Sequence, residues 1–86
     1  MRNVTEICGE LQRADVRLGE HAERITQLNQ NISQIMDRIQ TDFGRQEPAR
    51  QAVSELYHAV NLCAKADSAL YRSRLQVRKL AASVCK

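Results

Sequence analysis

The feature that most constrains this chain is an apolar stripe whose members alternate in steps of three and four residues from Val4 to Ile39. Written as heptads, the first position holds Val4, Leu11, Leu18, Ile25, Ile32 and Ile39, and the fourth holds Ile7, Ala14, His21, Leu28 and Ile35. A repeat averaging about 3.5 residues keeps one face of an α-helix turned toward a partner helix, as in coiled coils. The stripe therefore predicts a helix over residues 4 to 42.

A second stripe with the same spacing runs to the end of the chain. It holds Val53, Leu56, Val60, Cys63, Asp67, Leu70, Arg74, Val77, Ala81 and Val84. Between the two stripes lie Phe43, Gly44 and Pro48. Glycine can end a helix in the left-handed conformation, and proline suits the first turn of a helix because its missing N–H is not needed there. We predict a turn at residues 43 to 47 and a second helix over 48 to 85.

A short turn between two amphipathic helices forces them to pack antiparallel. With the turn centred near residue 45, every seam position meets another: Ile35 faces Leu56, and Leu28 faces Cys63. The predicted fold class is all-α, an antiparallel two-helix hairpin with coiled-coil-like packing. Residues 1 to 86 form one domain, which we expect to assemble into a four-helix bundle.

Composition agrees with a small helical protein and excludes several classes. The 86 residues include no Trp, two Tyr, one Phe, three Gly and one Pro, too few for a turn-rich β-fold. No apolar run approaches the roughly 18 residues that span a bilayer, and the first residues lack the apolar core of a secretory signal. We expect a cytoplasmic product, or one exported by a route without a cleaved signal.

The three cysteines, Cys8, Cys63 and Cys85, are an odd number and show no C-x-x-C spacing. This argues against a zinc site and against a disulfide framework. We expect reduced thiols. The alternative is a disulfide between Cys8 and Cys85, which the hairpin places near each other at its open end.

Three adjacent layers of the predicted seam contain a polar residue: Leu18 with Arg74, His21 with Leu70, and Ile25 with Asp67. We interpret them as a polar notch that fixes the register of the two helices. The alternative is that His21 and Asp67 form an acid–base or metal-binding pair. No nucleophile or third ligand accompanies them, so the sequence predicts no enzyme, no cofactor and no metal site.

The second helix has a wider apolar face than one narrow neighbour can cover. We predict that its flanks form a partner interface of Ala52, Tyr57, Ala59, Leu62, Ala66, Tyr71, Leu75 and Leu80. The expected partner is a second copy of the chain or another helical protein. The alternative is that the alanines serve helix propensity and the tyrosines stay half exposed.

Basic residues are concentrated in the second half of the chain, which holds seven basic and two acidic side chains between residues 48 and 86. A strip of cations could bind phosphate groups. However, the aromatic residues are not interleaved with them for base stacking, and cations near a helix C-terminus are favourable for the helix dipole alone. We therefore disfavour a nucleic-acid partner and keep a small basic regulator as an alternative.

The pair Phe43-Gly44 lies at the midpoint turn of a two-helix chain of just under a hundred residues. In this the chain resembles the WXG family of type VII secretion substrates and their small helical accessory proteins, which place Trp-x-Gly at that turn. The family's C-terminal Tyr-x-x-x-Asp/Glu signal has no match here, which suits an accessory protein whose partner supplies part of the export signal. Similar hairpins serve as chaperones of type III secretion subunits, which is the alternative role.

Overall fold

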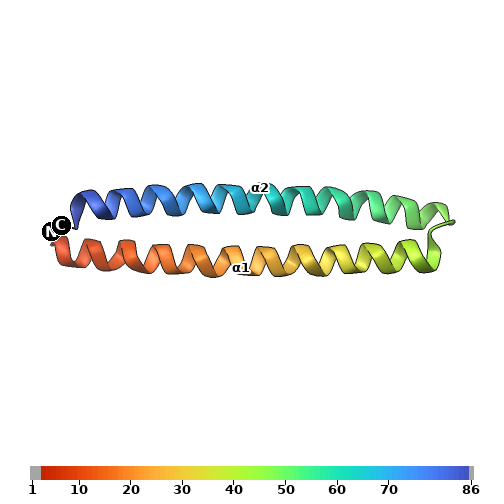
Figure 1. Cartoon of the computed structure of the whole chain (residues 1–86), viewed down its shortest axis with the longest axis horizontal. Coiled ribbons are helices and arrows are strands. Elements are labelled where there is room, and N and C mark those ends of the chain that lie inside the picture. Colours follow the sequence, from red (N-terminus) through yellow and green to blue (C-terminus); the bar gives the residue numbers. More distant parts are fainter. Residues whose placement is uncertain (1–2, 86) are drawn as a thin grey trace.

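The computed structural model describes residues 3 to 85. They form two α-helices, α1 (Val4–Phe43) and α2 (Glu47–Val84), of 40 and 38 residues. The helices lie side by side and antiparallel, so that the start of α1 and the end of α2 meet at one end of the rod (Figure 1). The molecule measures 62 × 19 × 14 Å. The all-α antiparallel hairpin predicted from the two stripes is confirmed.

Each helix begins at a residue suited to that place. Asn3 has an extended backbone, and its Oδ1 accepts a hydrogen bond of 2.8 Å from the N–H of Glu6. The first N–H groups of a helix have no partner within the helix, so such a cap stabilises the end. Helix α2 begins at Glu47-Pro48, where proline costs no hydrogen bond.

The turn uses glycine for a reason other than the one expected. Gly44 has φ −58° and ψ −17°, which is right-handed and not the left-handed conformation that we predicted. A Cβ atom at this position would collide with the carbonyl oxygen of Gln40. The turn closes with a hydrogen bond of 2.9 Å from the N–H of Gln46 to the carbonyl of Phe43. Glycine is therefore needed here for space.

The seam of α1 follows one of the two predicted columns along its length and the other only at Ile7 and Ala14, which are half-buried. The first column is half-buried from Leu11 onward, as expected. The second column of the contact is Cys8, Asp15, Ala22, Asn29 and Met36, each one residue beyond the predicted position. His21 is exposed, and Leu28 and Ile35 are 50% and 47% exposed. Both columns repeat every seven residues, so spacing alone does not choose between them.

The seam of α2 is lined by medium-sized and small side chains. Leu56, Cys63, Leu70 and Val77 are half-buried as predicted. Ala52, Ala59 and Ala66 join them, whereas Asp67 is exposed, contrary to its predicted seam position. Alanine lets the helices approach closely, because interaxial distance depends on the side chains at the contact.

The core of the hairpin is thin. Met36 and Ala49, each 9% exposed, are the most buried of the described residues, and both lie in the half of the molecule nearer the turn. None of the described side chains falls below 2% exposure. Two helices alone leave much of their apolar surface in water, as expected for so small a chain.

A disulfide closes the open end of the hairpin. The Sγ atoms of Cys8 and Cys85 are bonded at 2.08 Å, and their Cα atoms lie 5.9 Å apart. The expectation of reduced thiols is wrong for these two residues, because the contact column that includes Cys8 brings it to the end of α2. Cys63 is free and half-buried.

Among the described residues, no helix is long and apolar enough to cross a membrane.

Candidate interaction surfaces

An ion cluster joins the helices about two turns beyond the disulfide. Nε of Arg74 donates to Oδ1 of Asp15 at 3.0 Å, and Nε of Arg78 donates to Oδ1 and Oδ2 of the same carboxylate at 3.2 Å. The side chain of Asp15 is 23% exposed, that of Arg74 31% and that of Arg78 58%. Two cations of α2 therefore share one carboxylate of α1.

The arginines change the titration of the carboxylate. The hydrogen bond from Arg74 lowers the pKa of Asp15 below its ordinary value; partial desolvation opposes this, and a hydrogen bond from Arg78 and both positive charges add to it. Asp15 is therefore ionised at neutral pH. Leu18 and Arg74, predicted to share a seam layer, are both half-buried, and the polar partner of Arg74 on α1 is Asp15.

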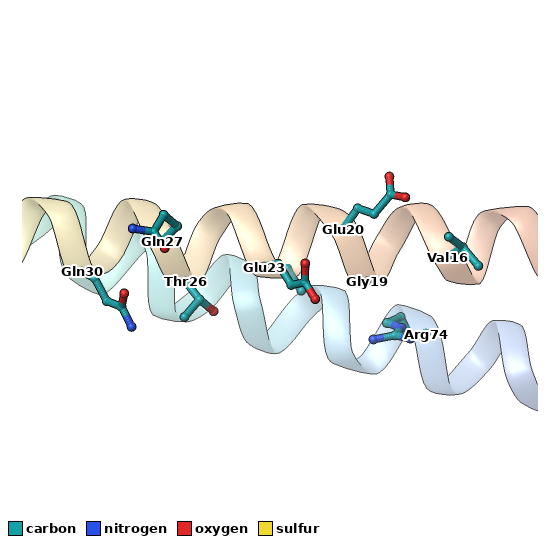
Figure 2. A pocket seen from close by; sticks show the side chains of 9 residues that line it. Val16, Gly19, Glu20, Glu23, Thr26, Gln27, Gln30 and Arg74 are labelled. Carbon is teal, nitrogen blue, oxygen red and sulfur yellow. The ribbon is translucent and has the colours of Figure 1, made fainter.

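Gly19 provides room for this cluster. A Cβ atom on Gly19 would lie 3.2 Å from Cζ, Nη1 and Nη2 of Arg74. Arg74 of α2 lies next to Gly19 of α1 in Figure 2, at one end of a shallow recess. Because Gly19 has no side chain, the guanidinium of Arg74 can lie against the surface of α1 and reach Asp15.

The recess beside Gly19 is lined mainly by polar residues and is formed almost entirely by one helix. Its volume is about 760 Å³. The residues that line it are Val16, Gly19, Glu20, Ala22, Glu23, Thr26, Gln27 and Gln30 of α1, together with Arg74. In Figure 2 the side chain of Glu20 points away from α2, and the other polar groups do not converge on one point. We name this surface the polar recess.

A second hollow lies on the other side of the seam and differs in character. Its volume is about 500 Å³. It is lined by His21, Arg24, Ile25 and Leu28 of α1 and by Ala66, Ala69, Leu70 and Ser73 of α2. Leu28 and Thr26 are two residues apart on α1, so their side chains point to nearly opposite sides of the helix. This separates the second hollow from the polar recess. We name the second hollow the apolar groove.

The apolar character of the groove continues toward the turn. Ile35 lies seven residues after Leu28 on α1, and Leu62 lies seven residues before Ala69 on α2. Residues seven apart share a helix face. Ile35 is 47% exposed and Leu62 is 55% exposed. Large aliphatic side chains thus stand in water on both walls, above the small side chains of α2.

The structure does not gather the predicted partner residues of α2 on one surface. Ala52, Ala59 and Ala66 are half-buried beside α1, whereas Tyr57, Leu62, Tyr71, Leu75 and Leu80 are 61%, 55%, 66%, 37% and 51% exposed. Tyr57 lies two residues from Ala59 and points to nearly the opposite side of α2. Ala59 shares a helix face with Ala66, which lines the groove, so the tyrosines lie on a different side from the groove. The predicted turn residues Phe43, Gly44 and Pro48 are exposed.

Sequence reasoning missed the contribution of α1 to this surface. Leu28 and Ile35 were assigned to the seam, where the second helix would have covered them. They are exposed because α1 packs against α2 through the neighbouring column instead. The sequence contains one signal of this: α1 carries apolar residues in the predicted column and also in the next one, at Ala22 and Met36. One partner helix cannot cover all of them.

The two residues proposed as an alternative acid–base or metal pair do not share a site. His21 is exposed at the wall of the apolar groove, and Asp67 is exposed but does not line it. Within residues 3 to 85, no group of three or more His, Cys, Asp or Glu side chains is placed to hold a metal ion.

The comparisons with known proteins add no family to this geometry. The chain matches no protein-family model, no curated protein and no solved structure.

Proposed function

We propose that this chain is a non-catalytic interaction module that binds a helix of a partner in its apolar groove. The observation that carries the proposal is the half-exposed state of Leu28, Ile35 and Leu62 along one face. Contiguous apolar surface on a soluble protein commonly marks an interaction site. Both helices of the hairpin already contribute to the groove, so a helix outside this hairpin would be the element that covers these side chains.

A helix is the occupant that the shape of the groove favours. The walls are two long antiparallel helices, and the exposed aliphatic residues recur at seven-residue intervals. A third helix could place its own ridge of side chains between such walls, which is how helical bundles are built. The small side chains of Ala66 and Ala69 leave room for that ridge. A partner hairpin would complete a four-helix bundle.

The sharpest form of the proposal is an accessory role in type VII secretion, with a WXG-like hairpin that binds a helical partner. Support comes from the two helices of similar length and from Phe43-Gly44 at their junction. The disulfide between Cys8 and Cys85 also favours a protein that works in an oxidising environment outside the cytoplasm. This supports a location outside the cytoplasm.

A pair of matched variants tests the proposed surface. Leu28→Glu places a charge in the apolar groove, whereas Val16→Glu places the same charge in the polar recess, and Val16 is similarly exposed at 54%. The tagged chain is co-expressed with the products of neighbouring genes, and helicity is checked by circular dichroism.

We expect one of these products to co-purify with the wild-type chain and with Val16→Glu, and to be lost with Leu28→Glu. A charge buried in an apolar interface without a partner opposes binding. If Leu28→Glu retains the partner as well as Val16→Glu does, the groove is not the binding surface. A wild-type chain that stays monomeric and captures none of these products contradicts the proposal.

A further inference from the structure

We infer that the occupant of the apolar groove is an amphipathic helix of another protein, with acidic side chains on both sides of its apolar stripe. This inference rests on the proposed function and adds the chemistry of the partner. It follows from the charges that border the groove, which have the same sign on both walls.

The wall formed by α1 carries two cations. Arg24 lines the groove itself, and Arg17, seven residues earlier, lines an adjoining recess together with Ala14 and His21. Both arginines are exposed. Since His21 borders both hollows, the two arginines stand along one continuous edge of the apolar surface.

The wall formed by α2 carries two more cations. Lys65 precedes Ala69 by four residues, and Arg72 follows it by three. Residues three and four apart are neighbours on a helix surface, so both side chains lie next to Ala69, which lines the groove. Both are exposed. We name Arg17, Arg24, Lys65 and Arg72 the basic rim.

Within residues 3 to 85, acidic side chains form no ion pair with the basic rim. In the part of the chain that the structure describes, ion pairs form at Arg50, Arg74 and Arg78, and none involves these four side chains. Glu20 lies three residues after Arg17 and four before Arg24, and it lines a recess together with Arg17, but within residues 3 to 85 no ion pair joins it to either arginine. Glu20 and Glu23 line the polar recess, and Asp67 points about 200° away from Ala69. Glu10 lines the recess of Arg17 at the end of the groove nearer the disulfide, whereas Asp42 and Glu55 lie toward the turn.

The sign of the rim selects among occupants. A second copy that paired groove to groove would use the same surface on both chains, because a two-fold interface is self-complementary. It would bring the basic rims of the two copies together, and like charges across an interface disfavour association. A helix with Asp or Glu on both sides of a Leu or Ile stripe would cover the apolar surface of the groove with its stripe. Its acidic side chains would lie next to the basic rim.

Two synthetic peptides of about 28 residues, or four heptads, test this inference. Both carry Leu at the two seam positions of every heptad. One carries Glu at the flanking positions, and the other carries Lys there. Their binding to the whole disulfide-bonded chain is measured by calorimetry at low and high salt.

We expect the Glu-flanked peptide to bind at least about tenfold more tightly than the Lys-flanked one at low salt, and the difference to shrink at high salt as the charges are screened. The variant Arg24→Glu/Lys65→Glu should reverse the preference. The matched control Arg45→Glu/Arg50→Glu makes the same change of net charge at exposed positions near the turn, outside the rim, and should retain the preference.

Other results overturn the inference in distinguishable ways. Equal affinity for the two peptides, abolished by Leu28→Glu, would show a helix-binding groove whose rim is irrelevant, so the proposed function would stand. Binding of neither peptide by a wild-type dimer that dissociates on Leu28→Glu would make a second copy the occupant. Salt-sensitive binding of duplex DNA that survives Leu28→Glu and requires the rim would assign the cations to phosphate. Binding of neither peptide by a monomer would contradict the proposed function too.

Discussion

Nε of Arg74 on α2 donates a hydrogen bond of 3.0 Å to Oδ1 of Asp15 on α1, between residues 59 apart in the sequence. The ion pair shows both the level and the rotation at which the two helices meet, because Asp15 belongs to the contact column that the heptads did not predict. The same rotation turns Leu28 and Ile35 to the edge of the seam. The apolar groove and the ion pair are therefore two consequences of one packing choice.

The first prediction concerns the pH dependence of stability. The folded-state pKa of Asp15 lies below its unfolded value, so the ionised carboxylate stabilises the fold above the unfolded pKa of about 3.9. This contribution is lost as the pH falls through the folded-state pKa. Urea unfolding should show Asp15→Asn less stable than wild type at pH 7, with the difference disappearing at strongly acidic pH. The control Asp42→Asn should match wild type at neutral pH.

The second prediction concerns the seam of α1. Met36 is 9% exposed and Leu28 is 50% exposed, although the heptads assign only Leu28 to the seam. We expect Met36→Ala to lower the free energy of unfolding by about 2 to 3 kcal/mol and Leu28→Ala by about 1 kcal/mol or less, because less area is lost from the contact. A larger loss for Leu28→Ala in urea denaturation would restore the predicted column.

The third prediction concerns a polar atom within the seam. Oδ1 of Asn29 is buried and has no hydrogen-bond partner among residues 3 to 85. An unsatisfied buried acceptor costs about 1 to 3 kcal/mol, so Asn29→Leu should raise the free energy of unfolding by about 1 kcal/mol or more. Asn61→Leu, at an exposed position of α2, should change it by less than about 0.5 kcal/mol. Thermal melts that show Asn29→Leu to be destabilised would mean that the amide has a needed partner.

The fourth prediction concerns the disulfide. Cys8 and Cys85 are separated by 77 residues, and a cross-link over so long a loop restricts the unfolded chain strongly. By the chain-entropy relation, reduction should lower the free energy of unfolding by about 4 kcal/mol, as should Cys8→Ser/Cys85→Ser. Cys63→Ser should retain the sensitivity to reductant. Equal melting temperatures with and without reductant would contradict the link.

The sequence predicted the hairpin well, but it predicted poorly which face of α1 turns toward α2. Two long seven-residue repeats joined by a segment with Gly44 and Pro48 leave little choice but two antiparallel helices. The second contact column was not predictable from spacing, because the columns of Leu28 and of Met36 have the same period. Hydrophobicity favoured the column of Leu28, because the column of Met36 contains the charged residue Asp15. The partner of Asp15, Arg74, is distant in sequence, so the ion pair that makes Asp15 acceptable at the seam could not be foreseen.

The candidate site was predicted only in part, for the same reason. Ala66 and Leu62 were identified from the width of the apolar face of α2, and the structure places them at or beside the groove. The wall formed by α1 was missed because Leu28 was assigned to the seam. The basic rim was invisible as a unit, since Arg24 and Lys65 become neighbours of one groove only when the relative rotation of the helices is known.

The most direct test of the account is a chemical-shift map of the isotope-labelled chain titrated with the Glu-flanked peptide. If a helix binds in the apolar groove, the amide and side-chain shifts should move at His21, Leu28, Ala66 and Ala69 and remain unchanged at Thr26, across the seam on α1. Shifts concentrated at the polar recess, or spread evenly along both helices, would contradict the claim that the groove is the binding surface.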